Sequence, residues 1–103
     1  MDIQSEIVGD KLIAGVKVKR LLAVDTEAFK ERMAALFQGH AGPVVLDLGE
    51  VEFIDSSGLG AVVALFKMRQ ELGGLELARL QPNVQSLLKL TKLDKVFVIH
   101  PGL

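Results

Sequence analysis

The chain contains no cysteine, no tryptophan and no tyrosine. Without cysteine it can form neither disulfides nor thiolate metal sites, and it has no thiol nucleophile. This is consistent with a reducing compartment. The only aromatic residues are five phenylalanines, which stand among aliphatic side chains rather than among lysines and arginines. Such an arrangement is unlike the aromatic platforms on which proteins stack nucleic acid bases.

A strong charge of one sign and a long apolar run are also lacking. Twelve basic and thirteen acidic residues give a formal net charge of −1, so no overall field attracts nucleic acid or an anionic membrane. The amino-terminal segment has no apolar stretch of signal length, and no run approaches the ~20 residues that span a bilayer. We therefore expect a cytoplasmic protein with neither a nucleic acid nor a membrane partner.

The composition is that of one well-packed domain covering residues 1–103. Half of the residues are hydrophobic and 24% are charged, and the length of 103 residues suits a single core. The first two β-prone runs are Ile3–Val8 and Leu12–Val18. Gly9 and Asp10 between them favour a tight turn, so the chain is expected to open with a hairpin.

Three later segments have the length and pattern of helices. The first starts at Asp25 or Thr26 and ends near Gly39, with apolar residues at helical spacing, namely Phe29, Met33, Leu36 and Phe37. The second runs from Ser57 to Leu72 and is stopped by Gly73 and Gly74. The third starts with Pro82 as its first helical residue and reaches about Thr91, with Val84, Leu87, Leu88 and Thr91 facing inward.

Strands are expected between these helices. Val44–Leu48 is almost continuously apolar, as in a strand that is covered on both faces. Leu75–Leu80 and Val96–Ile99 are the other candidates. The order ββαβαβαβ predicts an α/β fold with a mostly parallel, mixed sheet, because each strand-helix-strand unit is a crossover.

Asp55–Gly60 is the segment with the most interesting chemistry. It lies where a short run, Val51–Ile54, meets the second helix, and helix amino termini beyond the strand ends carry free amide donors. Ser56 or Ser57 could cap the helix, and an exposed hydroxyl there has donors nearby that suit a phosphate. Gly58 and Gly60 leave space for another backbone. Taken alone, the four residues Asp55-Ser56-Ser57-Gly58 are explained more simply by ordinary helix capping.

A longer sequence match favours a functional role for this segment over helix capping alone. The stretch from Val44 to Gly60, VVLDLGEVEFIDSSGLG, resembles the signature of the STAS domain in anti-sigma factor antagonists. The resemblance continues through Gly73-Gly74, the helix after Gln81 and the segment LDKVF, and it covers about Asp25 to Ile99.

The resemblance implies a partner switch that is not an enzyme. The unmodified protein would bind an anti-sigma factor that is also a serine kinase, and so release a sigma factor. Phosphorylation of Ser56 would end this binding, a serine phosphatase would restore it, and Ser57 would be the cap. The expected partner-binding residues are Asp55, Ser56, Ser57, Gly58, Leu59, Gly60, Val62 and Val63, with Leu59 partly exposed.

The chain departs from the family in two places. Many members carry an aspartate where this chain has Leu22, and that aspartate is thought to help the kinase; Asp25 could replace it but looks like a helix cap. Members usually add a helix after the last strand, whereas this chain stops at Leu103. The alternative is therefore an accessory or scaffold subunit, for example of a lipid-transporting ATPase, in which Ser56 is not phosphorylated. The oligomeric state stays open.

The residues needed for metal binding, dinucleotide binding or catalysis are not found. His40 and His100 have no partner at metal-ligand spacing, so no metal is expected. The acids Asp47, Glu50, Glu52 and Asp55 are most simply solvated surface groups. Val63 stands where a dinucleotide fingerprint needs its third glycine, and no histidine is placed as a base for Ser56. We expect no cofactor and no catalytic residue.

Overall fold

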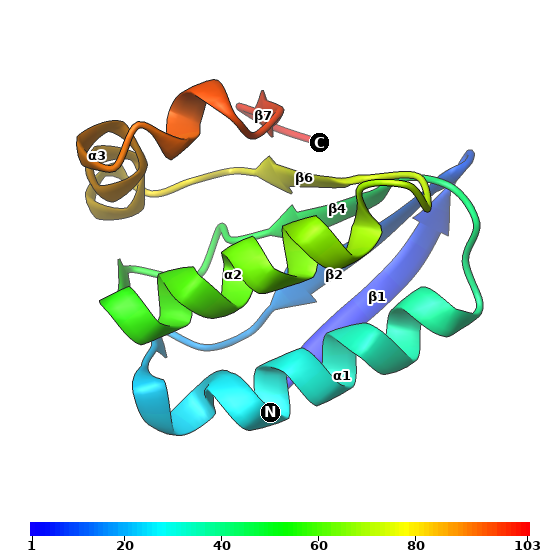
Figure 1. Ribbon diagram of the computed structural model, residues 1–103, viewed down its shortest axis with the longest axis horizontal. Helices are drawn as coiled ribbons and strands as arrows, with labels where there is room; N and C mark the ends of the chain where they lie inside the picture. Colours follow the sequence, from blue (N-terminus) through cyan, green and yellow to red (C-terminus); the bar gives the residue numbers. More distant parts are fainter.

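A five-stranded mixed sheet forms the frame of the protein in the computed structural model, which describes residues 1–103 (Figure 1). The strand order is β1-β2-β4-β6-β7; β1 and β2 are antiparallel, and all other neighbours are parallel. This confirms the predicted α/β fold. The strands are β1 (Ile3–Val8), β2 (Lys11–Val16), β4 (Val44–Asp47), β6 (Leu75–Ala78) and β7 (Ile99–His100).

The predicted turns and helix boundaries are largely found. Gly9 connects β1 to β2 with a φ of +63°, a backbone conformation that glycine adopts without strain. Gly73 and Gly74 follow the second helix with φ values of +115° and +87°. Pro82 is the first residue of the third helix, where its missing N–H has no intrahelical partner to lose.

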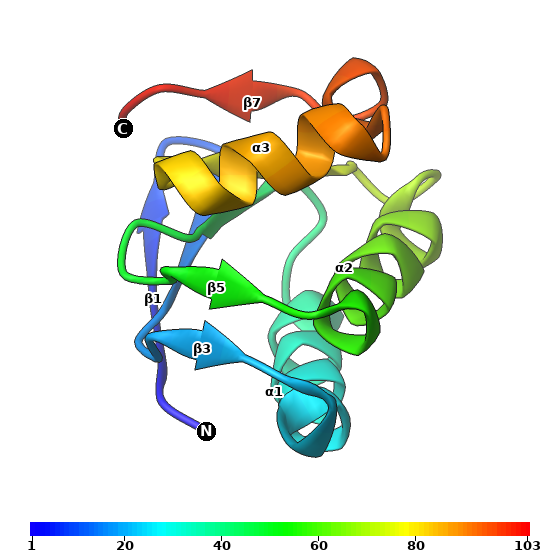
Figure 2. The ribbon, with the colours of Figure 1, turned by 90° about the vertical axis from the view of Figure 1, so that its left-hand side faces the viewer.

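Two helices cover one face of the sheet, and their buried sides make the core. α1 (Thr26–Gln38) and α2 (Ser56–Arg69) lie side by side on this face, while α3 (Pro82–Leu90) lies across the end of β6 (Figures 1 and 2). α1 buries Phe29, Met33 and Phe37, and α2 buries residues that include Val62 and Leu65. The central strand β4 is buried along its whole length, as predicted.

A second, two-stranded sheet was not expected. β3 (Arg20–Leu21) and β5 (Phe53–Ile54) pair in parallel and lie side by side below α3 in Figure 2. A 3-10 turn, η1 (Ala23–Asp25), follows β3, and α2 follows β5. Two-residue strands are too short to show an alternating pattern, so sequence periodicity cannot reveal them.

The carboxyl-terminal part differs from the prediction in two respects. Instead of a strand over Val96–Ile99, a 3-10 turn, η2 (Leu93–Lys95), precedes a strand of only Ile99–His100. Val96 and Val98 are about half exposed, since only Phe97 between them enters the core. Thr91 is exposed rather than inward-facing, and its hydroxyl donates to the carbonyl of Leu87 at 2.8 Å. No helix is both long and apolar enough to cross a membrane.

Phe97 attaches this segment to the core, so replacing it should lower the stability of the protein. Its ring contacts that of Phe66 edge to face, with centroids 4.7 Å apart. We predict that Phe97→Ala lowers the free energy of unfolding by about 3–4 kcal/mol, whereas Val98→Ala changes it by less than about 0.5 kcal/mol because Val98 is half exposed. Urea denaturation measures both. Equal losses in the two variants would contradict this assignment of the anchor.

Candidate functional site

Asp55 organises the edge of the protein where β5 meets α2. It is the residue just before the helix, with an extended backbone, and its Oδ1 accepts a hydrogen bond from the amide of Gly58 at 2.7 Å. Its Oδ2 accepts from the amide of Ala23 at 2.9 Å. One carboxylate therefore caps α2 and ties it to η1, a segment more than thirty residues earlier.

The prediction that Ser57 caps the helix is wrong, and so is the choice of Ser56 for that role. Both serines already belong to the first turn of α2. A cap must precede the first helical residue and accept from an amide two or three positions further on, and Asp55 meets both conditions. The carboxylate is also well placed electrostatically, because a helix amino terminus favours a negative charge.

Gly58 is required by the close approach of the two loops. A Cβ at this position would lie 2.4 Å from the carbonyl oxygen of Leu21 and 2.9 Å from Cγ2 of Ile54. That same carbonyl accepts from the amide of Asp55 at 3.2 Å, so it is not free to move. The predicted approach of another backbone is confirmed at Gly58. At Gly60 the space is open but no segment of this chain uses it, because no atom outside the helix lies within 4 Å of a Cβ built there.

Ser56 and Ser57 are exposed, and neither hydroxyl makes a hydrogen bond within the chain. Their amides belong to the first turn of α2, where backbone donors have no intrahelical partner. The end of the helix thus offers two accessible hydroxyls beside unpaired N–H groups and a partial positive charge. Phosphorylation of Ser56 stays a prediction, and the geometry is compatible with it.

The other predicted partner-binding residues divide between surface and core. Leu59 is partly exposed, as predicted, and Val63 is also partly exposed. Val62 is only 1% exposed and belongs to the main core cluster, so it supports the helix from within and offers no side chain to a partner. Gly58 is buried as well.

Asp25 serves η1 rather than α1. Its Oδ2 accepts from the amide of Leu22 at 2.9 Å, and it makes no side-chain capping bond to α1. Asp25 is thus the residue just before α1, as predicted, but the expected capping bond from its side chain is absent because the 3-10 turn engages the carboxylate. Leu22 is partly exposed in this same turn.

The loop before β5 is held by a buried acid that was predicted to be a surface group. Asp47 is 7% exposed, and Arg79 donates to its two carboxylate oxygens at 3.0 and 2.9 Å. These bonds raise the pKa of Arg79. Gln81 donates to the carbonyl of Gly49 at 2.8 Å, which fixes the loop from its other side. No group of three histidine or acidic residues is placed to hold a metal ion.

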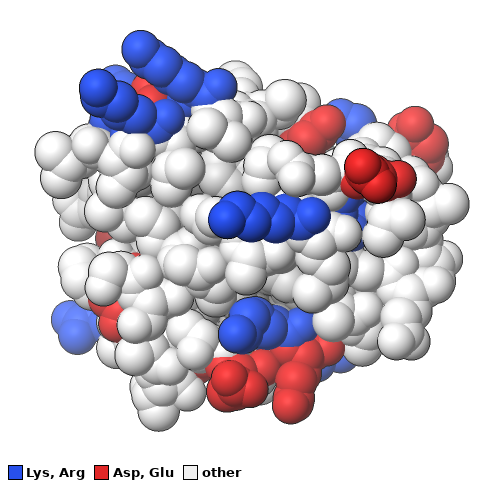
Figure 3. All heavy atoms as spheres, viewed as in Figure 1, with Lys and Arg blue, Asp and Glu red and all other residues white.

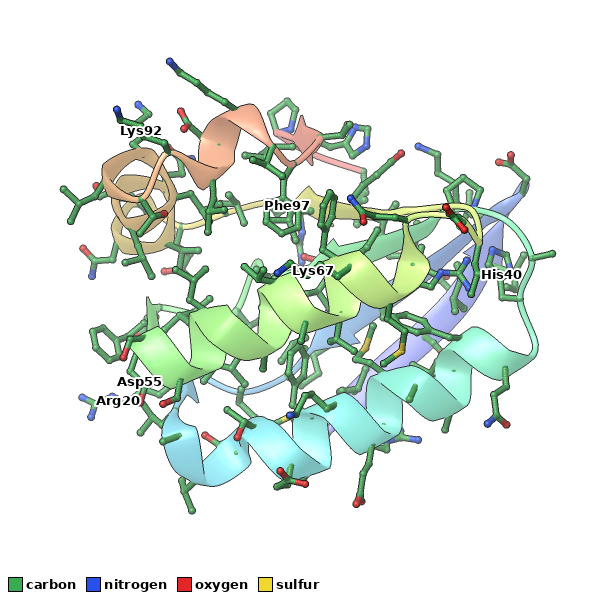
Figure 4. All side chains as sticks on the ribbon, in the orientation of Figure 1. Arg20, His40, Asp55, Lys67, Lys92 and Phe97 are labelled. Atoms are coloured by element: carbon green, nitrogen blue, oxygen red, sulfur yellow. The ribbon has the colours of Figure 1, made fainter.

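Three exposed side chains on this edge were missed by the sequence analysis. Val24 in η1 is 85% exposed, Phe53 in β5 is 47% exposed, and Arg20 lies opposite Phe53 in the two-stranded sheet. Figure 4 labels Arg20 and Asp55 close together at the end of α2, and in Figure 3, drawn in the same orientation, a basic side chain projects at this place, at the lower left. Their common location depends on the β3–β5 pairing, which the sequence does not reveal.

The chain belongs to the STAS domain family, whose model matches residues 18–103. BtrV of Bordetella bronchiseptica, named as an anti-sigma factor antagonist, is 31% identical over 78 residues, 75% of this chain and 67% of that protein. The anti-sigma F factor antagonist of Paenibacillus polymyxa is 34% identical over 58 residues, 55% of this chain and 50% of that protein. The chain thus spans between half and two thirds of these relatives.

Solved structures agree with this assignment. A protein of Thermotoga maritima, also named as an anti-sigma factor antagonist, is 28% identical, and the superposition covers 98% of this chain and 87% of that chain with a TM-score of 0.83. The murine anion transporter Slc26a9 contains the same fold, with a TM-score of 0.81 at 16% identity; the superposition covers 95% of this chain and 17% of that chain. At that identity the similarity concerns the fold alone.

The two glycines of α2 give a matched test of the loop contact. We predict that Gly58→Ala lowers the free energy of unfolding by about 1–3 kcal/mol, because the added methyl meets a fixed carbonyl. Gly60→Ala should instead raise it by up to about 1 kcal/mol, since alanine is the better helix former and the position is open. Urea unfolding of both variants is the measurement, and a Gly58→Ala variant as stable as wild type would exclude the close approach.

Proposed function

We propose that this protein is an anti-sigma factor antagonist that works as a partner switch. In its unmodified form it binds an anti-sigma factor that is also a serine kinase, and a sigma factor is thereby released. Phosphorylation of Ser56 by that kinase ends the binding, and a serine phosphatase restores it. The observation that carries the proposal is an exposed Ser56 with an unbonded hydroxyl on the fixed first turn of α2. The named relatives support the same reading.

The surface around Ser56 has features of a protein interface. Phe53 and Val24 expose apolar area, Leu59 adds a partly exposed aliphatic group, and Arg20 supplies a cation. Aromatic residues and arginine are the side chains most often found at energetic centres of interfaces. The segments that carry them are fixed by the β3–β5 pairing and by Asp55. Little ordering entropy should therefore oppose docking of the anti-sigma factor.

Phosphorylation should block docking without refolding the domain. A phosphoserine adds a charge of about −1.5 to −2, and the free amides of the helix end stabilise it by only about 1–2 kcal/mol. That is too little to rebuild the packed core. Buried at an interface without a cation, the same charge costs several kcal/mol, and each ~1.4 kcal/mol lowers the affinity tenfold.

Leu22 favours a second candidate function, that of a STAS accessory or scaffold subunit without phosphorylation. The carboxylate of Asp25 is engaged by the amide of Leu22, so it is not free to take the role of the family's aspartate. If an acid at this position helps the kinase, Leu22→Asp should raise the phosphorylation rate. The scaffold role gains support if no cognate kinase acts and the protein co-purifies with a transporter subunit.

The acceptor is identified by intact mass after incubation with a candidate anti-sigma kinase and ATP. We predict that wild type and Ser57→Ala each gain one phosphate, whereas Ser56→Ala gains none. Both substitutions leave the Asp55 cap intact, so the three proteins should be equally folded. If Ser56→Ala still gained a phosphate, the acceptor would be a residue other than Ser56. Ser57→Ala is the matched control.

The effect of charge is tested by Ser56→Asp. We expect it to weaken binding of the anti-sigma factor at least tenfold in a calorimetric titration, while circular dichroism stays unchanged. Ser5→Asp, which adds the same charge at an exposed serine of β1, should bind like wild type. Undiminished affinity of Ser56→Asp would contradict the blocking mechanism.

A further inference from the structure

The end of the molecule that carries Ser56 also includes α3. Figure 2 faces this end and shows α3 above β5 and β3, with the start of α2 below its carboxyl-terminal half. Asn83, in the first turn of α3, lines a hollow of about 320 Å³ together with Arg20, Glu52 and Phe53. The surface around Phe53 therefore continues onto α3.

The exposed side of α3 leads from this hollow to an uncovered apolar side chain. Ser86 and Leu90 follow Asn83 at i+3 and i+7, so the three residues share one face of the helix. All three are exposed, and Leu90 is 82% exposed. The surface that begins at Phe53 thus extends over two turns of α3 and ends on an aliphatic side chain.

Three lysines border this surface at the far end of α3. Lys89 is in the last turn of the helix, Lys92 follows the helix and Lys95 is in η2; all three are exposed. Figure 3 shows a group of basic side chains at the upper left, where Figure 4, in the same orientation, labels Lys92. None of the ion pairs within 4.0 Å involves these lysines. Asp94 is the only acidic side chain in residues 81–103, whereas the rest of the chain has more acids than bases.

Helix stabilisation explains only part of this lysine border. A helix carboxyl terminus favours nearby cations, which accounts for Lys89 and Lys92. It accounts neither for Lys95, which lies beyond the helix, nor for the exposed Leu90. Lys92 also has a left-handed backbone with a φ of +61°, which glycine would adopt with less strain. Strained backbone of this kind is often found at functional sites.

We propose that the lysine border, formed by Lys89, Lys92 and Lys95, steers an acidic surface of the anti-sigma factor onto the edge around Ser56. This proposal rests on the proposed function and adds the chemistry of the partner. The partner presents acidic side chains opposite the lysines, beside an apolar group that covers Leu90. Charges at the rim of an interface mainly raise the rate of association and its dependence on salt.

A protein surface suits this border better than a lipid bilayer does. Basic clusters that bind anionic lipids contain about four to eight lysines or arginines, and three lysines are grouped here. Glu52, which is exposed, and Asp94, which is partly exposed, lie on the same end of the molecule. These acids would repel a continuous anionic surface, whereas a protein can place its acids opposite the lysines alone.

Stopped-flow binding of the candidate anti-sigma factor at low and high salt tests the proposal. The association rate constant of wild type should fall as sodium chloride is raised. At low salt, Lys92→Glu should lower it about threefold, and the triple variant Lys89→Gln, Lys92→Gln and Lys95→Gln about tenfold. The dissociation rate constants should change by less than about twofold. Melting temperatures close to that of wild type show that the variants are folded.

Lys67→Glu is the matched control, because Lys67 is an exposed lysine of α2 that no ion pair engages and that Figure 4 shows away from Lys92. It changes the net charge equally and should associate like wild type. An unchanged rate for Lys92→Glu, or an equal loss in Lys67→Glu, would overturn the steering role and leave the proposed function intact. Lysine-dependent binding to phosphatidylserine vesicles, with an unchanged rate towards the anti-sigma factor, would overturn the choice of a protein partner. If wild type itself does not bind the anti-sigma factor, the proposed function fails, and this proposal fails with it.

Discussion

The bridge made by the Asp55 carboxylate is the interaction on which the candidate site depends. Its two oxygens accept from Gly58, in the first turn of α2, and from Ala23, in the turn before α1. A charged acceptor shared between two amides is stronger than a neutral one. It holds together two segments that the chain brings from different places, and the absence of a Cβ at Gly58 lets them meet. Together with the β3–β5 pairing, this bridge gives Ser56, Val24 and Phe53 a common fixed surface.

In the mechanism that we propose, a fixed surface allows a single added charge to act as a switch. Side-chain hydrogen bonds hold α2 at both ends. Asp55 ties the amino-terminal end to η1, and Arg69 ties the carboxyl-terminal end to the turn after α1. A phosphate at Ser56 should therefore not shift the helices or strands of this packed structure. Its effect should be confined to what can dock on the edge, which is why the proposed mechanism acts on the partner's affinity and leaves the fold unchanged.

The main turns, helix ends and the central strand were predicted well from the sequence because local residue patterns determine them. Gly9, Pro82 and Gly73 each occupy the turn or helix end expected of them, and the apolar run of β4 is buried as its composition indicates. These features depend on backbone preferences and on hydrophobic spacing, which are readable along the chain.

The details of the site were less predictable because they depend on contacts between distant segments. Asp55 rather than Ser57 caps α2, since its carboxylate can serve two amides at once. Phe53 and Arg20 become neighbours only through a two-residue pairing. Asp47 is buried because Arg79, thirty-two residues later, neutralises it. No single stretch of sequence contains this information.

The most direct test of the account compares the two-dimensional amide NMR spectra of the unmodified protein and of the protein carrying phosphoserine at position 56. The account predicts shifts confined to residues 20–25 and 53–60, with the signals of the five-stranded sheet unchanged. Shifts spread through β2, β4 and β6 would mean that the phosphate refolds the domain, and would contradict it.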